Sequence, residues 1–294
     1  MNDALEQYLH SHIQCMRDDV LSGFVNEIKN EYSTAVVAIL FYGSCMRTGE
    51  YKGAVLDFYV IVDDYANTYE SRWYRWANSL LPPNVFYLQT NVGNQAYRTK
   101  YAVISQQALA DKVSAGAFHP YFWARFAQPF SYLYLRDDND RQWLAWMQAT
   151  SINTFTQKVI AACARDITSE EFWETGFKLT YSSELRTEPK DRASSIYLAN
   201  RCFYDEIFEM LGVRHAGESK VAFTWTVRIL VGKCLSILRL LKATTTFVGG
   251  VDYIAWKIER HTGDKIEVSN RLRKYPWIFG WPILIKLILN KSIR

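Results

Sequence analysis

The hydrophobic positions of this 294-residue chain follow two different rhythms, one in each half. Residues 4–30 repeat apolar side chains at helical spacing, and four short apolar runs come after them. Runs of that length, bounded by polar and turn residues, predict strands. The predicted strands cover 35–41, 55–62, 84–88 and 100–104.

Beyond a charged break at 136–140, helical spacing dominates the sequence. The predicted helices cover 142–164, 169–184, 193–210 and 226–241. Strands followed by a run of helices indicate the α+β class. We therefore expect an α/β domain with a short mixed sheet at 1–135, a helical domain at 136–274 and a tail at 275–294.

The tail is predicted to be an amphipathic helix that contacts a membrane. Its apolar run is far shorter than the roughly 20 residues needed to span a bilayer, and Lys286 interrupts it. On a helix, Lys286, Asn290 and Arg294 share one stripe. Trp277 and Trp281 precede that stripe, and tryptophans beside cations are typical of interfacial helices. A terminal helix packed on its own protein is the alternative.

Charge favours the same partner. Residues 251–294 contain nine Lys/Arg and four Asp/Glu, which leaves 25 against 26 in the rest of the chain. The basic excess therefore belongs to the C-terminal region and indicates an anionic membrane surface. No Lys/Arg-rich helix interleaved with aromatics appears, so nucleic acid is not an expected partner.

The five cysteines are scattered and include no CxxC pair, which favours reduced thiols in the cytoplasm. The first residues lack the pattern of a secretion signal. We expect a cytoplasmic protein that lies peripherally on the inner face of the membrane. The sequence leaves the oligomeric state open.

The strongest chemical signal is a glycine–serine turn followed by a lone aspartate. Gly43 and Ser44 follow the first predicted strand, and Asp57 lies inside the second. A carboxylate within an apolar strand is costly to bury unless it meets a cation or a hydrogen-bond donor. Backbone N–H groups at a turn that opens a helix can bind phosphate oxygens. A phosphate cradle beside a metal-binding aspartate is the arrangement that a nucleotidyltransferase needs.

Seven short motifs occur in a fixed order from about residue 40 towards the C-terminus. They cover 42–44, 56–58 with 62–64, 84–87, 100–105, 123–129, 179–186, and 238–242 with Thr245, Tyr253 and 257–258. In this order they resemble the peripheral, mitochondrial-type phosphatidate cytidylyltransferases, which make CDP-diacylglycerol. The resemblance implies a nucleotidyltransferase-type α/β domain followed by a helical domain.

The resemblance also implies a reaction. The phosphate of phosphatidic acid attacks the α-phosphorus of CTP, and pyrophosphate leaves in a Mg²⁺-dependent step. The second pKa of a phosphate monoester is about 6, so the nucleophile is already ionised. The protein must then supply positioning and charge neutralisation.

The implied roles fall into three groups. Catalysis is expected from Asp57, Lys100 and Arg186, with Asp57 as the first magnesium ligand. Nucleotide binding is expected from Gly43, Ser44, Arg47, Lys52 and Arg125. Contact with the lipid or membrane is expected from Arg239, Lys242, Lys257, Trp277, Trp281 and Lys286. Tyr42 and Tyr59 could stack near the cytosine, or simply belong to the core.

The second metal ligand is harder to assign. The usual nucleotidyltransferase signature carries a second aspartate two residues after the first, where this chain has Tyr59. Asp63 lies six residues beyond Asp57, about 20 Å away along a strand, and cannot share an ion with it. Glu184 is the better candidate. Its alternative role is a salt bridge to Arg186 or Lys178.

Two other functions remain open from the sequence. One is a soluble nucleotidyltransferase that acts on a sugar phosphate, a small molecule or a protein. The other is a catalytically inactive lipid-binding relative, which the missing second aspartate favours. The sequence does not fix the base preference among CTP, ATP and UTP.

Overall fold

The computed structural model describes residues 3–163, 167–184, 191–213, 221–246 and 269–270. The tail at 275–294 lies outside these ranges. So do five residues predicted to take part in the site or the membrane contact: Arg186, Lys257, Trp277, Trp281 and Lys286. Their roles stay predictions.

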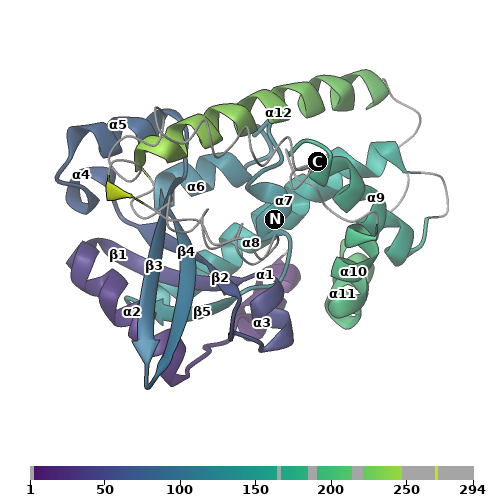
Figure 1. Ribbon diagram of the computed structural model, residues 1–294. Coiled ribbons are helices and arrows are strands. Elements are labelled where there is room, and N and C mark those ends of the chain that lie inside the picture. Colours follow the sequence, from purple (N-terminus) through teal and green to yellow (C-terminus); the bar gives the residue numbers. More distant parts are fainter. Residues whose placement is uncertain (1–2, 164–166, 185–190, 214–220, 247–268, 271–294) are drawn as a thin grey trace.

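A mixed five-stranded sheet forms the first part of the fold (Figure 1). The strands are β1 (Val36–Tyr42), β2 (Val55–Val62), β3 (Asn84–Val92), β4 (Gln95–Ser105) and β5 (Ser131–Leu135). They lie in the order β3-β4-β2-β1-β5, with β2 and β4 parallel and the other neighbours antiparallel. The sheet is followed by a helical region, so the α+β class is confirmed.

The strand predictions hold best where burial is deepest. The predicted bounds of β2 match those observed, and β1 is shifted by one residue. Strands β3 and β4 are longer than predicted because they form a hairpin whose two-residue turn holds Gly93 at φ +59°. Strand β5 was missed, since this five-residue edge strand is only partly buried and has no long apolar run.

The helices surround the sheet and continue beyond it. They are α1 (Asp3–His12), α2 (Asp19–Tyr32), α3 (Ser44–Thr48), α4 (Tyr65–Thr68), α5 (Arg72–Leu80), α6 (Gln106–Val113), α7 (Trp123–Phe126), α8 (Asp138–Val159), α9 (Ser169–Tyr181), α10 (Arg192–Ala199), α11 (Arg201–Leu211) and α12 (Val221–Thr246), with 3₁₀ turns at Ser33–Ala35 and Ile160–Ala162.

Two predicted helices are each interrupted. The stretch 4–30 splits into α1 and α2, because Met16 and Gln14 pair through their backbones with Tyr132 of β5. Asp18 then caps α2 by accepting a hydrogen bond from the Leu21 N–H (2.8 Å). The stretch 193–210 splits at Asn200, whose φ of −140° and ψ of 38° end α10 and precede α11.

Alternation along β2 separates two hydrophobic clusters. Phe58, Val60 and Val62 pack with Phe24 and other residues of α2 on one face of the sheet. Tyr59 and Ile61 face the other way, into the cluster that contains α1 and α6–α9. Asp57 shares the parity of Tyr59, so it projects from the face that meets the helical region.

The second cluster joins the sheet to the helical region. It includes Tyr59 of β2, Phe155 of α8 and Trp173 of α9. Gly176 of α9 lies against the Phe155 ring so closely that a Cβ there would be 2.1 Å from Cζ. The domain limits at 135 and 274 stay predictions.

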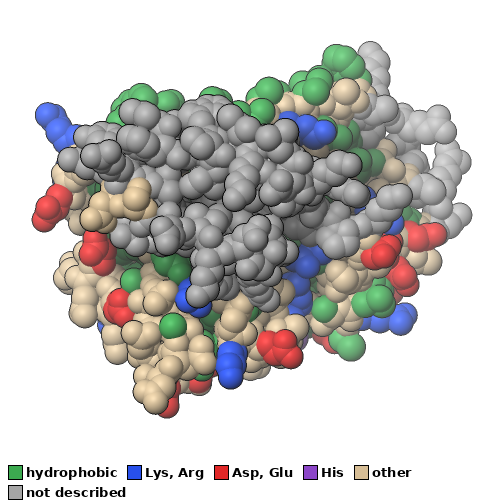
Figure 2. Space-filling view, viewed as in Figure 1, with side chains coloured by type: hydrophobic (Ala, Val, Ile, Leu, Met, Phe, Trp, Pro, Cys, Tyr) green, Lys and Arg blue, Asp and Glu red, His purple; other side chains and the backbone are tan. Residues whose placement is uncertain are grey.

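Hydrophobic side chains gather along the upper margin of the molecule in Figure 2, where Figure 1 places α5 and α12. The exposed ones include Trp76 of α5 and Leu230 and Leu241 of α12. Among the described helices, none is both long and apolar enough to cross a membrane. All five cysteines are free thiols.

Candidate functional site

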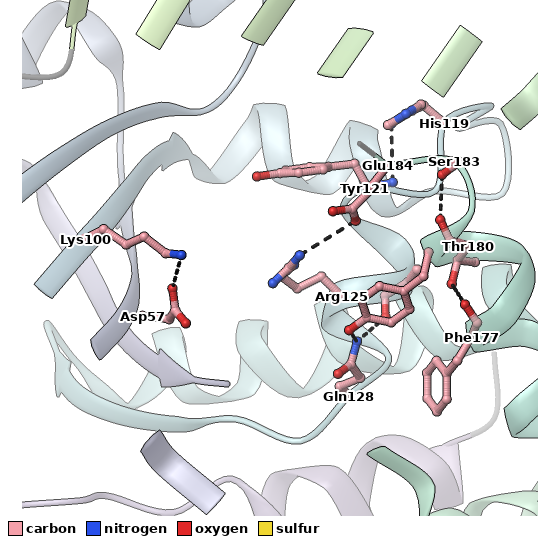
Figure 3. Close-up of polar contacts among 12 residues, drawn as sticks. Asp57, Lys100, His119, Tyr121, Arg125, Gln128, Phe177, Thr180, Ser183 and Glu184 are labelled. Atoms are coloured by element: carbon pink, nitrogen blue, oxygen red, sulfur yellow. Dashed lines mark hydrogen bonds and ion pairs between the residues drawn. The ribbon is translucent and has the colours of Figure 1, made fainter. Parts of the chain in front are cut away.

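Strand register brings the central charges together. Asp57 of β2 pairs with Tyr42 on β1 and with Lys100 on β4. Residues that pair across neighbouring strands project from the same face, so the three side chains form one row. Lys100 Nζ lies 2.9 Å from Asp57 Oδ1 (Figure 3). The cation that Asp57 requires is therefore supplied by the adjacent parallel strand.

Gly43 makes room for this carboxylate. Its φ is +90° and its ψ is −162°, a conformation that residues with a Cβ essentially never adopt. A Cβ built on Gly43 would lie 3.0 Å from Asp57 Oδ2. Ser44 then begins the short helix α3, which ends at Gly49. The turn predicted from Gly43-Ser44 thus lies directly beside Asp57.

Arg125 of α7 approaches the row from the helical side. Its guanidinium lies 3.7 Å from Glu184, which follows α9 (Figure 3). The same group lies over the ring of Tyr42 at 5.3 Å and over that of Tyr121 at 5.7 Å. Ring faces and the Glu184 carboxylate both stabilise the positive charge of Arg125 in this half-buried position.

These groups line a cavity with a water-accessible volume of about 240 Å³. Its first wall comes from the sheet and the turn after β1, and includes Gly43, Asp57 and Lys100. Its second wall comes from the helical region. That wall comprises Tyr121, Arg125, Gln128, Pro129, Tyr181, Arg192, Asn200 and Tyr204.

Positive charge gathers in the cavity. Arg47, Lys100, Arg125 and Arg192 line it, and among the lining residues that the structure describes Asp57 is the one carboxylate. Burial, followed by the positive charge of Arg192, lowers the pKa of Arg47 from its usual value. Cations gathered in a partly buried space attract an anion that binds between them. The cavity is therefore suited to a ligand with several negative charges, such as a nucleoside triphosphate.

Several predicted site residues meet in this cavity. Those are Gly43, Ser44, Arg47, Asp57, Lys100 and Arg125. Lys52 is exposed and is not among the lining residues. Glu184 is also absent from the lining, since it lies behind Arg125. It forms an ion pair with Arg125. Of the two partners considered from the sequence, Lys178 pairs with Glu174, and Arg186 lies outside the described residues.

Arg239 and Lys242 of α12 do not line the cavity and lie on the loop between α5 and β3. Arg239 Nε donates to the Pro82 carbonyl at 3.1 Å, and its guanidinium covers the Tyr121 ring at 4.2 Å. Lys242 Nζ donates to the Pro83 carbonyl at 2.6 Å. In these positions both cations fix α12 to the loop between α5 and β3. Their predicted role in lipid binding stays a prediction.

Sequence reasoning predicted Arg125 in the second wall but singled out none of the wall's other residues. Arg192, Asn200 and Tyr204 belong to no motif singled out in the sequence, and Gln128 and Tyr181 were not singled out within theirs. Arg192 begins α10, and only the packing of α10 on α9 and α11 brings it to the sheet. A cation at the start of a helix is unfavourable beside the positive end of the helix dipole. This unfavourable position of Arg192 was the one feature of the sequence that could have indicated a functional role.

The site offers limited ligands for magnesium. The described residues include no group of three His, Cys, Asp or Glu side chains that could hold a metal ion. Mg²⁺ usually binds one or two carboxylates together with substrate phosphates and water. Asp57 fits the role of that single carboxylate, with the remaining oxygens supplied by a nucleotide and water. Tyr59, at the place of the second aspartate, is fully buried.

Comparison with known proteins adds little. No family model and no curated protein matches the sequence. Among solved structures, the chain is similar to a nucleotidyltransferase-like protein from Exiguobacterium sibiricum 255-15. The identity is 11%, the match covers 94% of this chain and 93% of the other, and the TM-score is 0.27. A likeness with so low a TM-score says nothing about the activity of this chain.

Proposed function

We propose that this protein is a nucleotidyltransferase that converts CTP and phosphatidic acid into CDP-diacylglycerol and pyrophosphate. One observation carries the proposal. A single cavity combines the Gly43 turn, the Asp57 carboxylate and four cationic side chains contributed by two walls. Transfer of a nucleotidyl group needs positioning and neutralisation of phosphate charge more than acid–base chemistry.

The cations have distinct tasks in this proposal. Arg47, Lys100, Arg125 and Arg192 bind the phosphate oxygens, with the arginines suited to two-pronged contacts and the lysine acting as a point charge. An acceptor phosphate oxygen forms a bond to the α-phosphorus, and the bond between the α-phosphorus and the bridging oxygen breaks. The pyrophosphate takes that electron pair and remains among the cations until it is released.

Asp57 is proposed to hold the magnesium ion that accompanies the nucleotide. The ion, when bound, supplies further neutralisation of charge on the triphosphate. Lys100 at 2.9 Å currently compensates the carboxylate. Its flexible stem allows the ammonium to turn from Asp57 to a phosphate oxygen when the nucleotide arrives. The exchange leaves the carboxylate available to the metal.

The lipid acceptor is supported by the sequence. The motif order resembles the phosphatidate cytidylyltransferases, and the basic, tryptophan-bearing tail is typical of an interfacial helix. The rings of Tyr42 and Tyr121 line the cavity, and Arg125 lies over both of them, so a base would stack there only after Arg125 had moved.

Pyrophosphate release by the purified protein tests the proposal. The assay uses Mg²⁺, CTP and mixed micelles with or without phosphatidic acid, and a parallel series replaces CTP by ATP. Release that requires both CTP and phosphatidic acid is expected. Release without lipid would instead assign a soluble nucleotidyltransferase, and the product would identify its acceptor.

A second candidate is a nucleotide- or lipid-binding protein without transferase activity. The specific observation in its favour is that both carboxylates near the cavity are engaged by cations, Asp57 by Lys100 and Glu184 by Arg125. Binding of Mg-CTP without pyrophosphate release, under any acceptor, would favour this candidate.

A further inference from the structure

Helix α12 turns cationic side chains towards the protein and apolar side chains outward. Its inward face carries Arg228, Gly232 and Arg239, and Arg228 is only 5% exposed. Its outward face carries leucine, isoleucine and phenylalanine side chains. A surface helix in water normally has the opposite arrangement, with the apolar stripe towards the core.

Carbonyl groups of the protein hold the inward cations. Arg228 Nε donates to the Phe118 carbonyl at 2.8 Å, and its guanidinium lies 4.6 Å from the centre of the Trp225 ring. Arg239 and Lys242 donate to the carbonyls of Pro82 and Pro83. Gly232 lets the helix approach until a Cβ would lie 2.5 Å from the Ser183 carbonyl oxygen. The orientation of α12 is therefore fixed by specific contacts.

The outward residues form one continuous stripe. Phe223 is 76% exposed and Leu230 is 59% exposed. They are followed at spacings of four, three and four by Cys234, Ile237 and Leu241, all exposed. Positions three or four apart share a face of a helix, and 26 residues extend about 39 Å.

Helix α5 continues this apolar stripe. Trp73 and Trp76 are exposed, with ring centres 5.3 Å apart, and Leu80 is 67% exposed. The hydrogen bonds from Arg239 and Lys242 reach the loop directly after α5, so the end of α5 lies close to α12. Figure 2 shows hydrophobic side chains along this margin. We call the exposed residues of α5 and α12 together the apolar ridge.

An exposed apolar patch of this extent is typical of a surface that binds a protein or a membrane. The charged residues beside it indicate which of these two partners it binds. Neither α5 nor α12 contains an aspartate or glutamate, whereas Arg72 and Lys233 are exposed on them. Tryptophan rings and cations around an apolar face are the composition of an interfacial membrane contact. A protein partner of ordinary composition would give no reason for excluding acidic residues from both helices.

We propose that the apolar ridge lies on an anionic lipid membrane, with the leucines in the acyl boundary and Arg72 and Lys233 at the headgroups. The contact is separate from the predicted tail at 275–294. The purpose of this contact rests on the proposed function, because a lipid acceptor must be taken from a bilayer. The membrane binding itself rests on the surface residues alone. Membrane binding without nucleotide tests the ridge independently of catalysis.

The test is co-sedimentation of the full chain with vesicles of phosphatidylcholine, with or without phosphatidylglycerol. One variant combines Leu238→Ser with Leu241→Ser on α12, and a second combines Trp73→Ser with Trp76→Ser on α5. The control combines Leu198→Ser with Met210→Ser, exposed apolar positions on α10 and α11. Every variant keeps the tail, so the differences report the ridge alone.

We expect both ridge variants to partition about tenfold more weakly into phosphatidylglycerol vesicles, and the control to match the parent. Equal partitioning of ridge and control variants would overturn the proposal. So would equal binding of the parent to both vesicle types. A parent dimer that both ridge variants dissociate, measured by light scattering, would assign the ridge to a second copy. A loss of thermal stability without vesicles in both ridge variants would assign it to another part of the chain.

Discussion

The two walls of the cavity differ in how they handle charge. The sheet wall holds Asp57 and Lys100 as a pair of opposite sign, joined at 2.9 Å by strand register. The helical wall presents Arg125 and Arg192 to the cavity, and the carboxylate of Glu184 lies behind Arg125. The sheet wall contributes one carboxylate and two cations, since Arg47 lines it as well, whereas the charged lining residues described for the helical wall are both arginines. Both walls therefore supply positive charge, and the sheet wall supplies the carboxylate that a metal ion needs.

The largest effect is expected from the sheet wall. Asp57→Asn keeps the shape of the side chain and removes the carboxylate charge that the magnesium ion needs. We expect the rate of pyrophosphate release to fall by about 100-fold or more, as when one charge-stabilising group is removed from an active site. Asp63→Asn, at the far end of the same segment, is the control and should change the rate little. Comparable rates for the two variants would contradict the role of Asp57.

Gly43→Ala tests whether the turn and the carboxylate fit together. The alanine Cβ would lie 3.0 Å from Asp57 Oδ2 at a φ of +90°. We expect a cost of about 1–3 kcal/mol in unfolding free energy from backbone strain, together with weaker Mg-CTP binding. Gly49→Ala is the control, since it shares a positive φ but would meet nothing within 4 Å. The control should lose stability without losing nucleotide affinity, as denaturant unfolding and calorimetry would show.

Arg192→Gln tests the helical wall. The glutamine keeps much of the side chain and removes one cation from the cavity. We expect about a tenfold loss of CTP affinity, in line with a contribution of about 1.5–3 kcal/mol from a hydrogen bond to a charged group. The matched control is Arg201→Gln, at an exposed arginine that pairs with Asp205 outside the cavity. If Arg192→Gln bound CTP like the parent, Arg192 would have no part in nucleotide binding.

The smallest effect is expected on the pH dependence of stability, through Lys242, which fixes α12 to the loop between α5 and β3. Burial, followed by the charge of Arg239, lowers the pKa of Lys242 to about 7 from 10.5. The unfolded chain therefore binds a proton that the folded protein lacks between these two values. Stability should rise as the pH increases through this window. The unfolding free energy, measured in urea at about pH 7 and pH 9.5, should rise less in Lys242→Met than in the parent.

Lys233→Met on the exposed side of the same helix is the control for that measurement. It should keep the pH dependence of the parent. An identical pH slope in Lys242→Met and the parent would show that the buried lysine does not titrate in this range.

The sheet wall could be predicted from the sequence because strands impose a simple rule. A continuous apolar run fixed the bounds of β2, and the charge within it identified Asp57. The pairing of Asp57 with Lys100 then depends only on the alignment of two neighbouring strands. What the sequence did not show was the edge strand β5, whose few half-buried residues have no distinct pattern.

The helical wall could not be predicted in the same way. Arg192 reaches the cavity through the packing of three helices, and no local pattern encodes that approach. The orientation of helix α12 could not be predicted either. Its mixture of leucines and cations predicted a helix at 226–241, but not that the cations Arg228 and Arg239 would face inward. Carbonyl groups distant in sequence decide that orientation.

The most direct test of the account is calorimetric titration of the protein with CTP, CDP and CMP in the presence of Mg²⁺. If the two walls enclose a polyphosphate, affinity should fall from CTP to CDP to CMP. The difference in affinity between CTP and CMP should be smaller in Arg192→Gln than in the parent. The variant lacks one of the cations that would bind the additional phosphates of CTP. Equal affinity for the three nucleotides, or a gap that Arg192→Gln leaves unchanged, would contradict a triphosphate site built from both walls.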